Sequence, residues 1–101
     1  EIRNISRDVA IKFAPNSQYG KMALEQKAYF DNAQQALDKK LENEGMTQEE
    51  HQEESSILSD TRNASLKIDP NADQNLRTRQ LDLMVKKNQL VRTIQKHPFL
   101  L

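Results

Sequence analysis

The most regular hydrophobic pattern of the chain lies between residues 76 and 96, where apolar side chains recur at helical spacing. They include Leu76, Leu81, Leu83, Met84, Leu90, Val91 and Ile94. This spacing, with a drift close to a seven-residue repeat, is typical of an amphipathic helix. Pro70 suits the first position of such a helix, and Pro98 pushes the residue before it out of the helical region. We therefore expect a helix over about 71–96.

Two registers coexist within this segment, and neither is free of polar residues. One places Leu76, Leu83 and Leu90 on a seven-residue period, with Ile94 beside them. The other gathers Leu81, Met84, Val91 and Asn88. The resulting broad stripe favours a helical bundle over a long two-stranded coiled coil. Asn88 within the stripe either fixes the register between partners or, as the simpler interpretation, faces water.

A second helical pattern occupies about 17–43. Its apolar stripe consists of Met22, Tyr29 or Phe30, Ala33, Leu37 and Leu41. The alanines of this segment favour helix and allow a neighbouring helix to approach closely. Gly45 follows the stripe at the place where a helix commonly ends in a left-handed residue, which predicts the end of the helix near 43.

A third, very polar helix is expected over about 48–62. Thr47 and Glu50 have the spacing of a capping box, in which each side chain satisfies an exposed backbone N–H. Ile57 and Leu58 are the large apolar residues of this segment. A helix with so little to bury is predicted to lie on the surface or to be weakly held.

The first 15 residues show a different pattern. Val9, Ile11 and Phe13 alternate with Ala10 and Lys12, as in a strand with one buried face. One interpretation is an extended arm, 1–15, that adds a strand to the sheet edge of a partner. The other is an extended or partly helical lead-in that packs on the chain's own helices.

These elements predict an all-α fold, either a helical hairpin or a three-helix arrangement. The extended N-terminal arm precedes a helical module, 16–101, which ends in an apolar tail. The first and third helices are expected to pack antiparallel. In that arrangement Tyr29, Phe30, Leu37 and Leu41 meet Leu81, Met84, Val91 and Ile94.

The charges divide the chain into two parts although the net charge is zero. Residues 1–66 carry 12 acidic and 8 basic side chains, whereas residues 67–101 carry 3 acidic and 7 basic ones. An acidic and a basic segment of this kind suggest two helices that pair, within one chain or between chains. The hydrophobic content of 36% is below the ~45–50% of ordinary globular domains, which predicts a thin core.

Candidate chemistry is sparse. The chain has no cysteine and two histidines. His51 lies beside Glu50 and three residues before Glu54, but a zinc site needs three or four ligands and a supporting shell, so a solvated acidic face is the preferred interpretation. With only two glycines, no phosphate-binding loop can be formed. We expect no enzyme activity, no cofactor and no metal site.

The pattern therefore favours a structural or assembly subunit, or a segment, of a larger complex of the virion, secretion or scaffold type. The expected partners are proteins, as a homo-oligomer or a multi-subunit complex, in the cytoplasm or within an assembled particle. The sequence begins at Glu1, which suggests a processed product or a fragment. The expected partner-binding residues are Leu81, Leu83, Met84, Leu90, Val91, Ile94, Phe99, Leu100 and Leu101.

Two alternatives belong to other classes. In the first, the basic helix over 77–96 binds nucleic acid, using Arg77, Arg79, Lys86, Lys87, Arg92 and Lys96 to neutralise phosphates. The near-neutral pI of about 7.0 and the lack of interleaved aromatic residues make this less favoured. In the second, the chain is a regulatory adaptor that folds only on its partner.

Overall fold

The computed structural model describes residues 2–96 of the chain, and it describes side-chain surroundings from Arg7 onward. Its helices are α1 (Ile2–Phe13), α2 (Gln18–Asn43), α3 (Gln48–Ala64) and α4 (Gln74–Lys96), with a short 3₁₀ helix, η1 (Ser65–Lys67), after α3. No strand occurs between residues 2 and 96. The predicted all-α fold is therefore confirmed, and the three predicted helices begin and end within three residues of their observed bounds.

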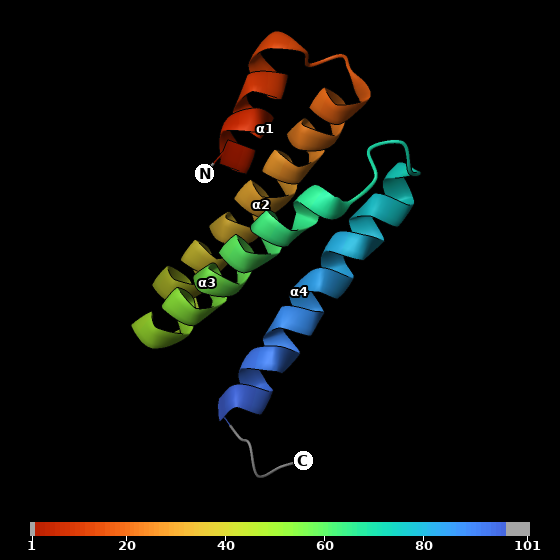
Figure 1. The fold of residues 1–101 in the computed structure, drawn as a ribbon. Helices are drawn as coiled ribbons and strands as arrows, with labels where there is room; N and C mark the ends of the chain where they lie inside the picture. The colour runs from red at the N-terminus through yellow and green to blue at the C-terminus, as the bar shows by residue number, and fades with distance from the viewer. Residues whose placement is uncertain (1, 97–101) are drawn as a thin grey trace.

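The expected extended arm is wrong for Ile2–Phe13, which form α1 and pack against α2 (Figure 1). Arg7 is buried, and Ala10 and Ile11 are half-buried. These positions are spaced i, i+3 and i+4, so they lie on one face of a helix. Phe13 is 72% exposed, which shows that the apparent alternation did not mark a buried strand face.

Local side-chain contacts define both ends of α2. The Ser17 hydroxyl donates to the carbonyl oxygen of Ala14 at 2.7 Å and accepts from the Gly20 N–H at 3.0 Å. This cap satisfies one of the N–H groups left free at the start of a helix. At the other end, Gly45 has φ +75°, and the Met46 N–H returns to the Lys40 carbonyl at 3.2 Å. The glycine thus ends the helix as predicted.

The polar helix α3 occupies a more central place than the sequence suggests. It contacts α2 on one side and α4 on the other (Figure 1). Ile57 is 2% exposed, and Thr61 is fully buried, so the prediction of a surface-lying helix is wrong. The Thr61 hydroxyl donates to the Ile57 carbonyl at 2.8 Å, which allows a small polar side chain to be buried at little cost.

The direction of α4 differs from the prediction. Because α3 is a long return helix, α2 and α4 run parallel rather than antiparallel (Figure 1). The contacts between the two helices follow the same order in both sequences: Glu25 contacts Arg77, and further along both helices Tyr29 contacts Asp82. Because the chain reverses its direction after α2 and again after α3, α4 runs in the same direction as α2.

The core is small and lies where α2, α4 and the segment after η1 meet. Its buried members are Met22, Phe30, Ile68 and Leu81. Tyr19, Tyr29, Leu58 and Met84 pack around them. The Tyr29 and Phe30 rings are edge to face, with centroids 5.1 Å apart, an arrangement that aromatic pairs favour. The expected contact between the Phe30 and Leu81 regions is thus present, although Val91 remains 40% exposed.

Candidate interaction surface

A buried polar cluster joins α1 to the end of α3. The Arg7 guanidinium donates through Nη2 to the Arg62 carbonyl at 2.5 Å and to the Ser65 hydroxyl at 2.6 Å. Gln26 Nε2 donates to the Ser65 carbonyl at 3.1 Å. Burial, and then the nearby Arg62, lowers the pKa of Arg7 below its ordinary value. The cluster fixes three helices relative to one another, and its Ser65 hydroxyl is fully buried.

His51 interacts with an acid on the neighbouring helix and not with those of its own helix. Its Nε2 lies 2.7 Å from Asp38 Oδ1, between α3 and α2. Hydrogen bonds from His51 and then Gln34 lower the pKa of Asp38. Among the residues whose placement is described, no three histidine, aspartate or glutamate side chains form a group that could hold a metal ion. His51 therefore contributes to the α2–α3 contact.

The inner side of α4 is attached largely by polar contacts. Arg77 binds Glu25 of α2 with two hydrogen bonds, Nε–Oε2 at 3.0 Å and Nη2–Oε1 at 2.7 Å. Arg92 binds Asp60 at 2.9 Å, and Lys96 lies 2.5 Å from Glu53. Three of the six basic side chains of 77–96 therefore pair with acids of α2 and α3, as the division of charge predicts.

Asn88 also lies on this inner side, where its Nδ2 donates to the Thr61 hydroxyl at 2.8 Å. The simpler interpretation of Asn88, that it faces water, is therefore wrong. Because Thr61 is fully buried, this hydrogen bond holds α4 in one register against α3. A polar residue in an apolar stripe here specifies how two helices of the same chain align.

The outer side of α4 carries exposed leucines. Leu76, Leu83 and Leu90 are 44%, 64% and 60% exposed. At 100° per residue, a seven-residue spacing keeps three side chains within about 40° of one another. Arg79, Lys86 and Lys87 flank them and are exposed. We call these six residues the outer leucine face.

The cations of the outer leucine face have no acidic partner within the described part of the chain. None of the three takes part in the ion pairs formed among residues 7–96. Asp82 is the single acid of 74–96, and its Oδ1 accepts a hydrogen bond from the Tyr29 hydroxyl. The face therefore presents a narrow apolar stripe with a basic border.

The structure separates the predicted partner-binding residues into groups. Leu81 is buried, Met84 packs against the core, and Ile94 is half-buried, whereas Leu83, Leu90 and Val91 are exposed. Phe99, Leu100 and Leu101 lie outside the described residues. Leu76 belongs to the exposed stripe although it was not among the predicted residues. Its seven-residue spacing from Leu83 was the signal that could have identified it.

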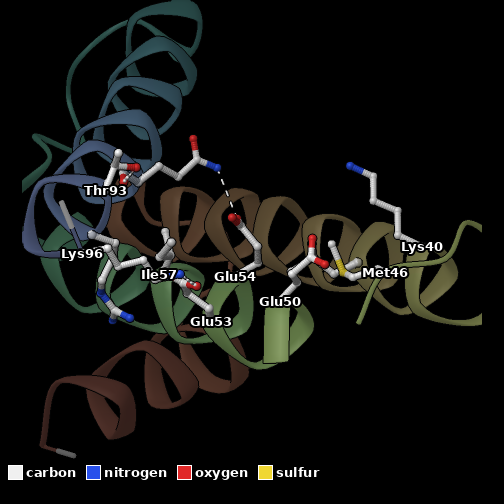
Figure 2. A pocket seen from close by; sticks show the side chains of 11 residues that line it. Lys40, Met46, Glu50, Glu53, Glu54, Ile57, Thr93 and Lys96 are labelled. Atoms are coloured by element: carbon white, nitrogen blue, oxygen red, sulfur yellow. Dashed lines mark hydrogen bonds and ion pairs between the residues drawn. The ribbon is translucent and has the colours of Figure 1, made fainter. Parts of the chain in front are cut away.

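An open hollow of about 600 Å³ lies between the end of α2, the start of α3 and the end of α4. Figure 2 shows acidic side chains of α3, among them Glu53 and Glu54, around this hollow. Gln89 donates to Glu54 at 3.3 Å, and Lys96 pairs with Glu53. These four polar side chains therefore bind one another and contribute to the contact between α3 and α4.

Tyr29 provides a spectroscopic test of the α2–α4 contact. Its hydroxyl donates to Asp82 Oδ1 at 2.5 Å, and burial followed by this hydrogen bond raises the pKa of Tyr29 well above its ordinary value of 10.0. In a Tyr19→Phe background, absorbance titration should show tyrosinate forming above pH 10, and Asp82→Asn should lower the midpoint. Folding favours the neutral form of the Tyr29 hydroxyl. This group therefore stabilises the folded state below pH 10, and the stabilisation is lost as the pH rises further.

An unchanged midpoint in Asp82→Asn would contradict the contact. Tyr29→Phe in the same background should abolish the signal and serves as the control for its assignment.

Comparison of this chain with protein-family models, with curated proteins and with solved structures finds no match. None of the helices in the described part combines the length and the apolar character needed to cross a membrane. The function therefore has to be inferred from the surface of the chain itself.

Proposed function

We propose that the chain is a non-enzymatic structural or assembly subunit, or a segment, of a larger protein complex, and that it acts through helix–helix packing. The observation that carries the proposal is the outer leucine face. Leu83 and Leu90 are each at least 60% exposed, and they share one line along α4 with Leu76. Single exposed leucines are ordinary, but an aligned row with a polar border is typical of a helix-docking surface.

The free energy of leucine burial indicates how much of α4 a partner has to contact. Full burial of a leucine contributes about 1.5–3 kcal/mol, so completing the burial of three half-exposed leucines contributes about 2–4.5 kcal/mol in total. Micromolar affinity needs about 8 kcal/mol. The leucines alone therefore cannot account for stable binding, and the flanking side chains have to contribute as well.

Nucleic acid remains the second candidate function, supported by the exposure of Arg79, Lys86 and Lys87. Three other cations, Arg77, Arg92 and Lys96, already pair with carboxylates. Half of the basic residues of 77–96 therefore remain to contact phosphates, and leucines lie between them on the helix surface. The helices α2, α3 and α4 share a core, which favours a prefolded module over an adaptor that folds only on its partner.

The test is the light-scattering mass of the full chain over a hundredfold range of loading, at about 0.1 M and about 1 M NaCl. High salt shortens the range of the repulsion between the flanking cations to about 3 Å, so the leucines and the aliphatic parts of the flanking side chains can pack together. We expect the mass to rise with concentration at high salt, and Leu83→Asp to abolish the rise.

The matched control is Leu24→Asp, which changes a leucine that is 41% exposed and belongs to α2, outside the outer leucine face. It should associate like the unmodified chain. Equal loss of association in both variants would contradict a role for the outer leucine face.

A further inference from the structure

We infer that the partner at the outer leucine face is a protein helix whose apolar stripe is bordered by acidic side chains. This inference rests on the proposed function and identifies the chemistry of the partner. It follows from three features: the seven-residue spacing of the leucines, the placement of the cations, and the lack of acidic residues on this side of α4.

The cations occupy both borders of the stripe. Measured from Leu83 at 100° per residue, Arg79 and Lys86 lie about 40–60° to one side, and Lys87 lies about 40° to the other. In two helices packed along a seam, the residues that border the seam meet those of the partner and determine which partner is chosen. Acidic borders on the partner therefore complement both sides.

A second copy docked through the same face fits poorly. Such a pair would place Arg79, Lys86 and Lys87 of one chain against the same cations of the other, and like charges across an interface are unfavourable. Asp82 cannot offset this repulsion, because it lies about 100° from Leu83 and binds Tyr29. The charge pattern thus disfavours homotypic pairing of α4.

Anionic lipid and nucleic acid share the charge but not the shape of the proposed partner. A helix lying on a membrane has a broad apolar face, often with aromatic residues. Here the exposed leucines span about 40°, Lys87 lies between them and the exposed Val91, and residues 74–96 contain no aromatic side chain. Nucleic acid offers phosphates for the cations but no apolar stripe for the leucines. An acidic amphipathic helix satisfies both requirements.

The chain itself can supply the probe. The variant Arg79→Glu/Lys86→Glu/Lys87→Glu keeps Leu76, Leu83 and Leu90 but borders them with acids. It therefore presents the surface that we infer for the partner. Mixed with the unmodified full chain at about 0.1 M NaCl, it should form a 1:1 pair by light-scattering mass, at a loading where each chain alone is monomeric. At about 1 M NaCl the pair should bind at least tenfold more weakly.

Two controls distinguish an effect of the outer leucine face from an effect of the net charge of the chain. The variant Lys21→Glu/Lys39→Glu/Lys67→Glu has the same change in net charge at exposed lysines outside α4, and it should not pair with the unmodified chain. Leu83→Asp in the unmodified chain should abolish the mixed pair. Circular dichroism of each variant, compared with that of the unmodified chain, verifies that the helices are kept.

The remaining outcomes distinguish this inference from the proposed function. If the unmodified chain self-associates through Leu83 and the mixture gains nothing, the acidic partner is wrong and the proposed function stands. If no chain associates at either salt concentration, both are wrong. If the mixture stays monomeric while phosphatidylserine vesicles or duplex DNA bind the chain through Lys86 and Lys87, the partner is not a protein helix and the inference is overturned.

Discussion

Replacement of Ile57 by alanine should lower the free energy of unfolding by about 2–5 kcal/mol, the range for deleting a well-packed aliphatic side chain. Ile57 is 2% exposed in α3, which contacts both α2 and α4. Its loss removes apolar contacts and leaves a space that the surrounding helices fill only in part. A small domain has about 5–15 kcal/mol of stability in total, so this single change would remove a large share of it.

Urea denaturation followed by circular dichroism measures this effect. The matched control is Leu83→Ala, on the exposed side of α4, which should change the stability by no more than about 0.5 kcal/mol. If the two variants behaved alike, α3 would be the weakly held surface helix that its polar sequence predicts, and the arrangement of helices described above would be wrong.

Gly20→Ala should destabilise the fold by about 1–3 kcal/mol, as overpacking of a tight contact does. A Cβ at Gly20 would overlap the carbonyl oxygen of Ala14 and lie 2.9 Å from the carbonyl carbon of the same residue. Both are backbone atoms at the turn between α1 and α2, so relief requires α1 to move. The Ser17 cap, which accepts from the Gly20 N–H, would be disturbed with it.

The sign of the Gly20 effect is the decisive measurement. Glycine within a helix is ordinarily worse than alanine by about 0.5–1 kcal/mol, so the same substitution at an unobstructed helical site would stabilise the protein. A lower urea midpoint, together with faster amide exchange in α1, is the expected result. A higher midpoint would show that α1 does not approach α2 at this turn.

Several helix ends were predictable because local chemistry determines them, although α4 begins at Gln74 and not at Pro70 as predicted. The Glu50 N–H donates to the Thr47 hydroxyl at 3.1 Å, as the spacing of the two residues predicts, although the Thr47 hydroxyl also donates to the Glu50 carboxylate at 3.0 Å. Gly45 adopts the positive φ expected of a residue that ends a helix. Such contacts span three or four residues and can be read from spacing alone.

The arrangement of the helices was less predictable, because it depends on contacts between distant residues. The burial of Arg7 requires Ser65, which is 58 residues away. Thr61 was not recognised as a buried residue because its polarity is satisfied only by the Ile57 carbonyl and by Asn88. In α1, alternation over five residues was too short to distinguish a strand from one face of a helix.

The outer leucine face was predictable only in part, because its position also depends on contacts between distant residues. A seven-residue period identifies aligned leucines, but it does not say which of two registers faces inward. Leu81 faces the core, whereas Leu83, two residues later, faces solvent. That choice is made by Phe30 and Ile68, which form the core with Leu81.

The weak anchoring of α4 has a consequence for how binding and folding are coupled. Leu81 is the one buried residue among the 23 of α4, whereas α2 has five. Local opening begins where few apolar contacts hold an element, so α4 is expected to detach before α2. A partner that binds only the docked helix shifts this equilibrium by mass action, so its concentration sets the fraction of chains in which α4 is closed. Occupancy of the outer leucine face would thereby be transmitted to Thr61 of α3, which α4 contacts from its opposite side through Asn88.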